Sequence, residues 1–152
     1  MDRTEPAIFT NMCMISDGAG NVLVEDRRNP NWPGLTFPGG HVEPGESFCA
    51  SVVREVREET GLTIEHPVLC GIKQFPASDG GARYIVLFFK ADSFSGRLAP
   101  SSEGDVFWLP RAELKNRNLA PDFAEMLRVF EDDTLSEFFY YKENGEWKIE
   151  LR

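Results

Sequence analysis

Hydrophobic and polar residues along this chain follow two different periods. Short runs of β-branched and aromatic residues, bounded by turn formers, predict strands. In residues 48–60 the apolar positions instead recur every three to four residues, which is typical of an amphipathic helix. The combination predicts an α+β fold with a mixed sheet and flanking helices.

The predicted strands cover residues 8–15, 22–24, 35–37, 69–75, 84–91 and 106–109, with a terminal hairpin over 138–151. Turn-forming clusters at residues 17–21, 78–81 and 144–145 predict that the strands on either side of each cluster pair as hairpins. A second, weaker helix is predicted over residues 121–130, with Pro121 in its first turn. No repeat or linker divides the chain, so we expect one domain over residues 1–152.

The helix predicted over residues 48–60 has two distinct sides. At about 100° per residue, an arc of roughly 140° faces the sheet and contains Phe48, Cys49, Val52, Val53, Val56 and Thr60. Glu55, Glu58 and Glu59 share an adjoining arc of about 100°. Gly61 and Leu62 follow the last turn and predict a left-handed cap with an apolar contact.

Charge and composition exclude several classes of protein. With 152 residues and a formal net charge of -9, the chain is poorly suited to coat a nucleic-acid polymer, because phosphate binding needs lysine and arginine. No apolar run approaches the roughly 20 residues that span a bilayer, and no signal peptide is evident, so we expect a cytoplasmic protein. The three cysteines, Cys13, Cys49 and Cys70, are expected to be reduced thiols in the core.

Two interpretations of the acidic helix arc compete. Like charges four residues apart repel each other, and a solvated surface would screen them. Alternatively, the carboxylates hold a divalent cation such as Mg²⁺, which takes oxygen ligands from proteins and from substrate phosphates. Periodicity alone does not choose between the two.

The spacing between the glycines, glutamates and arginine of this region favours the metal site. Gly40, five residues, Glu46, seven residues and then REVREETGL over 54–62 follow the pattern G-x5-E-x7-R-E-U-x-E-E-x-G-U, in which U is aliphatic. This pattern resembles the signature of the Nudix hydrolases, which cleave nucleoside diphosphates linked to another group. The resemblance implies the αβα sandwich of that family.

The resemblance also implies roles for individual residues. Glu55, Glu58 and Glu59 would bind Mg²⁺, or Mn²⁺ as its substitute, with the carbonyl of Gly39 as a further ligand. Glu103, ahead of a predicted strand, matches a later acidic ligand or base. Which of Glu55 and Glu103 removes the proton from water stays open, as does the number of metal ions.

Outside the metal ligands, Glu46 and Arg54 are expected to form an ion pair that holds the loop against the helix. Arg27 is expected to face substrate phosphate. Asp122 is a candidate to read the nucleotide base, with a helix-capping role as the alternative.

Three aromatic residues, Phe37, Trp32 and Phe75, are candidates to stack on the nucleotide base. Buried aromatic residues nevertheless commonly belong to the core. Asn11 is expected near the same pocket, whereas His41 is interpreted as structural.

The form FPGGHVEPGES, residues 37–47, is similar to that of MutT-type enzymes. This implies hydrolysis of a nucleoside triphosphate, including 8-oxo-dGTP, to the monophosphate and pyrophosphate, and a role in nucleotide pool sanitisation. Dihydroneopterin triphosphate, a nucleotide sugar or a dinucleoside polyphosphate remain alternative substrates, and a non-catalytic nucleotide sensor is a further alternative. A small-molecule nucleotide is the expected partner of a monomer or homodimer.

Overall fold

The computed structural model describes residues 1–77 and 80–152. In chain order the elements are β1 (Ala7–Ile15), β2 (Asn21–Arg27), β3 (Gly34–Thr36), α1 (Phe48–Thr60), β4 (Leu62–Glu65), β5 (Val68–Pro76), β6 (Arg83–Ala91), β7 (Ser93–Gly96), β8 (Gly104–Pro110), the 3-10 helix η1 (Arg111–Asn116), α2 (Phe123–Glu131), β9 (Glu137–Glu143) and β10 (Glu146–Leu151). Among these residues, no helix is long and apolar enough to cross a membrane.

A mixed five-stranded sheet forms the centre of the molecule, in the order β1-β6-β5-β9-β10. β1 runs parallel to β6 and β5 runs parallel to β9, whereas β5–β6 and β9–β10 are antiparallel. A separate three-stranded sheet has the order β3-β2-β8.

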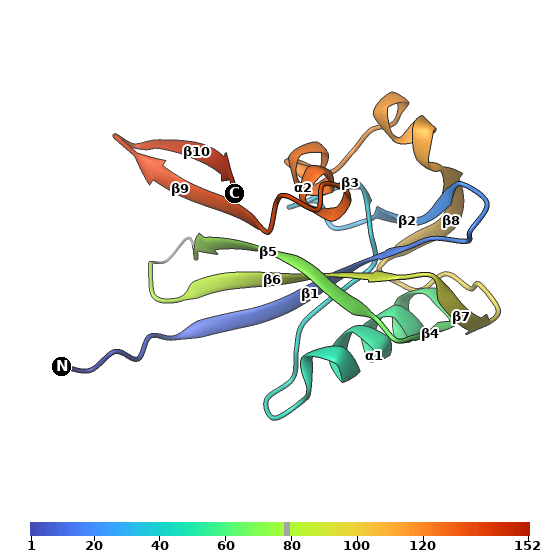
Figure 1. Cartoon of the computed structure of the whole chain (residues 1–152), viewed down its shortest axis with the longest axis horizontal. Coiled ribbons are helices and arrows are strands. Elements are labelled where there is room, and N and C mark those ends of the chain that lie inside the picture. The colour runs from blue at the N-terminus through green and yellow to red at the C-terminus, as the bar shows by residue number, and fades with distance from the viewer. Residues whose placement is uncertain (78–79) are drawn as a thin grey trace.

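Helices cover opposite faces of the central sheet (Figure 1). On one face, Val52 and Val56 of α1 are fully buried against a cluster that includes Cys13 and Phe89. On the other face, α2 packs in a cluster with aromatic residues of the sheet, among them Phe88. The two clusters produce the expected αβα sandwich, in which each face of the sheet removes apolar surface from water.

Helix α1 begins and ends where the sequence predicts. The Ser47 hydroxyl accepts a hydrogen bond from the Ala50 amide at 3.0 Å. At the other end Gly61 adopts φ 80°, and its N–H donates to the Arg57 carbonyl. A Cβ at Gly61 would lie 2.4 Å from the Arg97 carbonyl oxygen, so the tight cap needs glycine.

The turn around residues 17–21 does not form the predicted hairpin. β1 pairs with β6 in the central sheet, whereas β2 pairs with β3 and β8 in the other. In the described part of the chain, the two segments are linked by the isolated bridge Ser16 to Val22. The turn therefore carries the chain between sheets. The hairpins β5–β6 and β9–β10 are confirmed, although Ser78 and Asp79 of the first predicted turn lie outside the described residues.

Several local predictions were wrong. Cys49 is exposed and Cys70 is half-buried, so only Cys13 is a core thiol. Phe48 is also exposed, and its ring contacts that of Phe9, which is itself partly exposed. Pro121 precedes α2, which begins at Phe123. The short pair β4–β7 and helix η1 were not predicted.

Candidate active site

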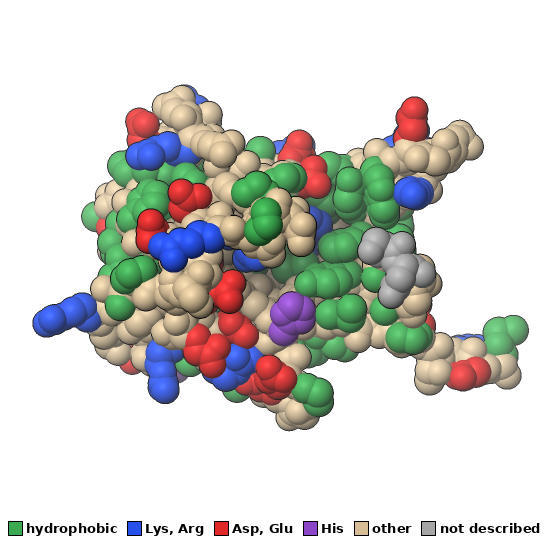
Figure 2. Space-filling view, turned by 180° about the vertical axis from the view of Figure 1, so that it is seen from behind, with side chains coloured by type: hydrophobic (Ala, Val, Ile, Leu, Met, Phe, Trp, Pro, Cys, Tyr) green, Lys and Arg blue, Asp and Glu red, His purple; other side chains and the backbone are tan. Residues whose placement is uncertain are grey.

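A cavity of about 650 Å³ lies between the central sheet, the loop before α1, and the end of β2 with the loop that follows it. Acidic side chains of α1 and the loop before β8 line one part, and aromatic side chains of β5, β6 and the loop after β2 line another. Figure 2 shows this division on the molecular surface, with acidic side chains gathered below a hollow and hydrophobic ones beside it.

The glycine pair before α1 lets the loop approach both β1 and α1 closely. A Cβ at Gly39 would lie 2.0 Å from the Asn11 carbonyl oxygen, and one at Gly40 would lie 2.3 Å from Oε2 of Glu55. The Gly39 N–H donates to Glu59 Oε2 at 3.0 Å. Since only glycine lacks a Cβ, the pair places backbone groups directly beside two of the predicted metal ligands.

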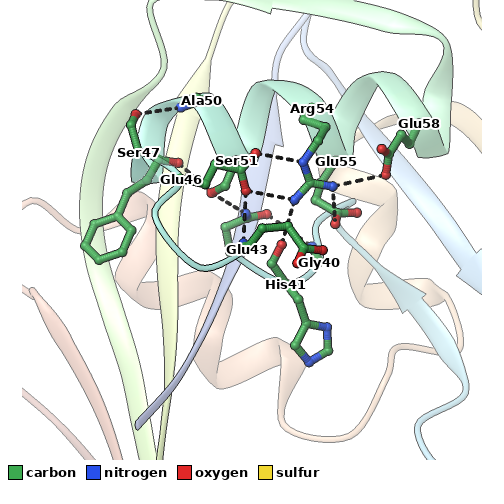
Figure 3. Close-up of polar contacts among 12 residues, drawn as sticks. Gly40, His41, Glu43, Glu46, Ser47, Ala50, Ser51, Arg54, Glu55 and Glu58 are labelled. Atoms are coloured by element: carbon green, nitrogen blue, oxygen red, sulfur yellow. Dashed lines mark hydrogen bonds and ion pairs between the residues drawn. The ribbon is translucent and has the colours of Figure 1, made fainter.

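Arg54 connects the loop to the helix (Figure 3). Its Nε and Nη2 donate to the two oxygens of Glu46 at 2.8 and 3.0 Å, and Nη2 also donates to the carbonyl of His41 at 2.9 Å. This bidentate pairing holds the pKa of Glu46 down at about 2. The predicted pairing of Glu46 and Arg54 is therefore present in the structure.

The same guanidinium reaches two of the predicted metal ligands. Nη1 of Arg54 lies 2.9 Å from Glu55 Oε1 and 3.2 Å from Glu58 Oε2. Glu55 is half-buried, and burial raises its pKa while Arg54 opposes the rise. Arg54 thus orients Glu55 and Glu58 and partly neutralises them.

Glu59 is buried next to a second carboxylate that sequence reasoning missed. Glu25 of β2 is 0 % exposed, and neither of its oxygens meets hydrogen-bond geometry with a described residue. Burial, together with the adjacent Glu25, raises the pKa of Glu59 to about 9. Burial likewise raises the pKa of Glu25. Two buried carboxyls side by side are unfavourable unless a proton or a cation joins them.

The donor chemistry fits a hard divalent cation, which takes carboxylate and carbonyl oxygens. In the described part of the chain, however, no three acidic, histidine or cysteine side chains already form a cluster with metal-binding geometry. Glu58 and Glu55 are turned toward Arg54, and Glu59 is turned toward Gly39. Binding a cation would require these carboxylates to exchange their present partners for the ion.

Arg27 and Trp32 lie together at the cavity. The Arg27 guanidinium carbon is 5.3 Å from the centre of the Trp32 ring, and Arg27 Nε is buried without a hydrogen-bond partner among the described residues. A cation held over an aromatic face with an unused donor is suited to an anionic group. Glu103 also lines the cavity, from an exposed loop position.

Asn11 and Phe37 line the cavity as predicted, and both also have contacts that hold the surrounding structure together. Asn11 is buried, and its side chain donates to Ser51 Oγ at 2.9 Å and accepts from the Gly40 N–H at 3.1 Å. It therefore fastens the glycine loop to β1 and α1. Phe37 is 1 % exposed and packs edge-on against Phe123 and Phe130, so its ring belongs to the core beneath the cavity and offers no open face for stacking.

Asp122 occupies the N-cap position of α2, with φ 66°, but its side chain makes no capping hydrogen bond. Asp122 thus stands at the start of the helix, as the alternative role requires, but forms no capping hydrogen bond, and it is not among the residues that line the cavity. Trp32 Nε1 donates to the Pro121 carbonyl at 3.1 Å, which joins the Trp32 loop to the segment carrying Asp122.

Sequence reasoning also missed two cavity residues. Lys73 of β5 is buried, and His41, interpreted as structural, lines the cavity near Tyr84. Glu25 and Lys73 were detectable in principle, because each places a charge directly after apolar residues of a strand, Val22–Val24 in β2 and Ile72 in β5.

Comparison with known proteins agrees with this geometry. The NUDIX domain family matches residues 9–130. An uncharacterized Nudix hydrolase, YvcI of Bacillus subtilis, is 34% identical over 119 residues, covering 76% of this chain and 73% of its own length. The NAD-capped RNA hydrolase NudC of Mycobacterium tuberculosis is 32% identical over 80% of this chain, which spans only 38% of that protein.

Among solved structures, a mutator MutT protein from Bacillus halodurans superposes with a TM-score of 0.75 at 25% identity, covering 94% of this chain and 97% of that one. The family match spans most of the chain, and it includes the glycine loop, α1 and every acidic residue discussed above. The chain therefore belongs to the Nudix family and is a hydrolase of phosphoric anhydride bonds in nucleoside diphosphate-linked compounds.

Proposed function

We propose that this enzyme hydrolyses a nucleoside triphosphate to the monophosphate and pyrophosphate, with Mg²⁺ as its cofactor. Water attacks one phosphorus of the triphosphate chain, the bridging anhydride bond breaks, and the water proton passes to a carboxylate. The observation that carries the proposal is the cavity itself. It combines a carboxylate-rich part with an aromatic part, as a compact nucleotide requires.

In this proposal Glu55, Glu58 and Glu59 hold the cation, with Glu103 and the Gly39 carbonyl as further oxygen ligands. When bound, Mg²⁺ neutralises phosphate charge and lowers the pKa of water. The raised pKa of Glu59 supports this assignment, because a buried pair of carboxyls favours a bound cation at neutral pH.

The remaining residues bind and orient the substrate. Arg27 donates to phosphate oxygens from its place over Trp32. Trp32 and the stacked pair Phe75 and Tyr84, whose ring centres are 4.9 Å apart, enclose the base. Glu103, on an exposed loop at the cavity, is proposed to accept the water proton.

The test is a substrate panel assayed with Mg²⁺. Canonical and oxidised nucleoside triphosphates, dihydroneopterin triphosphate, nucleotide sugars and dinucleoside polyphosphates would be compared by kcat/KM, with pyrophosphate and phosphate measured separately. We expect a nucleoside triphosphate, including 8-oxo-dGTP, to give the highest kcat/KM and to release pyrophosphate. The proposal would be contradicted if a nucleotide sugar or a dinucleoside polyphosphate gave the highest kcat/KM. Release of phosphate alone would contradict it as well.

A further inference from the structure

Lys73 is a buried cation in the aromatic part of the cavity. It is 7 % exposed, and its Nζ lies 4.9 Å from the centre of the Phe138 ring, 5.3 Å from Phe75 and 6.0 Å from both Trp32 and Tyr140. The nearest hydrogen-bond acceptor is the Met126 sulfur at 3.6 Å, which is a weak one.

Within residues 1–77 and 80–152, no carboxylate oxygen lies within 4.0 Å of this ammonium group. Aromatic faces compensate a buried cation only in part, and an ammonium group has three N–H donors to satisfy. Burial lowers the pKa of Lys73, while the more distant Asp122 and Glu125 oppose that shift. Lys73 thus lines the cavity with donors that the protein leaves largely unused.

The position of Lys73 separates it from the metal-binding part of the site. Lys73 pairs with Val86 on β6, and Val86 pairs with Thr10 on β1, which bridges to His41 of the loop before α1. Two strand spacings, about 10 Å, therefore lie between the backbones of Lys73 and Thr10, and the loop before α1 lies beyond Thr10. A nucleotide whose phosphates lie at the loop and α1 can direct its base toward Lys73.

Asp122 lies near Lys73, although it is not among the residues that line the cavity. Met126, whose sulfur accepts from Nζ, donates its backbone N–H to the Asp122 carbonyl at 3.0 Å. The Asp122 carboxylate acts on Lys73 from a distance and favours the charged ammonium form. A charged ammonium group in the cavity complements a base edge that carries a carbonyl oxygen, and it finds no acceptor where that edge carries an amino group.

We propose, on the basis of the proposed function, that Lys73 determines base specificity by donating to the O6 carbonyl of a guanine-type base. Adenine presents an amino group where guanine presents O6, so it would direct donors at the Lys73 ammonium. The 8-oxo modification leaves this edge unchanged. Lys73 therefore selects guanine over adenine, and does not separate oxidised from normal guanine.

The experiment compares wild type with Lys73→Met, Lys73→Gln and the control Lys90→Met, a lysine of β6 that does not line the cavity. Affinities for dGMP and dAMP are measured by calorimetry with Mg²⁺, and kcat/KM for dGTP and dATP is measured in parallel. Methionine matches the length of lysine and suits an apolar cage, so the variant should fold, which its thermal unfolding checks.

We expect wild type to prefer dGMP over dAMP. Lys73→Met should weaken dGMP binding about 10- to 100-fold while changing dAMP binding less than about threefold, because one charge-assisted hydrogen bond is lost. Lys73→Gln, which keeps an N–H donor, should recover part of the preference, and Lys90→Met should match wild type.

The role of Lys73 would be overturned if Lys73→Met lost affinity equally for dGMP and dAMP, or lost none for either. It would also be overturned if wild type showed no preference for dGMP. Failure of the proposed function has a different signature. In that case wild type would hydrolyse neither triphosphate to pyrophosphate, while the binding comparison would still decide whether Lys73 reads the base.

Discussion

At the scale of single residues, the acidic side chains of α1 have separate environments. Glu58 is largely exposed and contacts Arg54 at 3.2 Å, whereas Glu59 is buried and bound to the Gly39 N–H. These differences let one helix provide both a carboxylate fixed deep in the site and one at its mouth, which suits the stepwise capture of a hydrated cation.

Glu58→Gln and Glu59→Gln should each lower kcat by at least about 100-fold with the fold intact, because the amide keeps the shape of the side chain and removes the charge that holds the cation. Steady-state kinetics and circular dichroism check this outcome. Glu65→Gln, on β4 and outside the cavity, is the matched control. Wild-type turnover in Glu58→Gln or Glu59→Gln would reject the metal site.

The two loop glycines should respond differently to the same substitution. In Gly40→Ala, the atoms nearest to the added Cβ belong to the carboxyl group at the end of the Glu55 side chain. We therefore expect nearly unchanged stability but kcat lowered by about tenfold as Glu55 is displaced. Gly39→Ala meets the Asn11 backbone instead and should lower the free energy of unfolding by roughly 2 kcal/mol or more. Chemical denaturation and kinetics of both variants test the contrast. Equal loss of stability in the two would contradict it.

At the scale of elements, the loop before α1 and the helix act as one unit through Arg54. Glu46 anchors the guanidinium with two hydrogen bonds, and the opposite side of the guanidinium holds Glu55 and Glu58. Loss of Glu46 should therefore disturb the orientation of Glu55 and Glu58, the proposed metal ligands, while leaving their charge in place.

The Glu46–Arg54 pair should make stability depend on acid pH. The pKa of Glu46 is depressed to about 2, below its ordinary 4.5, so its stabilising contribution is present above pH 4.5 and is lost as pH falls toward 2. The stability advantage of wild type over Glu46→Gln should shrink across that window. Thermal unfolding at a series of pH values measures it, with Glu43→Gln of the same loop as control. An advantage that stays constant down to pH 2 would refute the assignment.

At the scale of the whole molecule, the site combines residues of the five-stranded sheet, the three-stranded sheet and α1. Glu25 comes from β2, the glycine loop is held by β1, and Lys73 comes from β5. Because no single element contains the site, ligand binding should couple to global stability.

Saturating Mg²⁺ with a non-hydrolysable nucleoside triphosphate analogue should raise the melting temperature by roughly 5–10 °C at about 100 times the dissociation constant, since the ligand binds only the folded state. Differential scanning calorimetry measures the shift. Mg²⁺ chelation, or the Glu59→Gln variant, should remove most of it. A shift that survives chelation would place the nucleotide away from the carboxylates.

Local sequence determined much of this protein. The 3.6-residue repeat, Ser47 and Gly61 define α1 and its ends, and the spacing from Gly40 to Leu62 identifies the family. These features rest on interactions between residues close in the chain, so periodicity and capping rules describe them well.

Tertiary structure decided the rest. β1 and β2 pair in different sheets despite a turn that favours a hairpin, because each strand buries its apolar face against a different cluster. The burial of Glu25 beside Glu59, and of Lys73 among aromatic rings, likewise depends on strands distant in sequence. The sequence by itself determined the acidic helix and the family to which the chain belongs, and only packing decided which charges face one another, because burial and electrostatic coupling arise from neighbours in space.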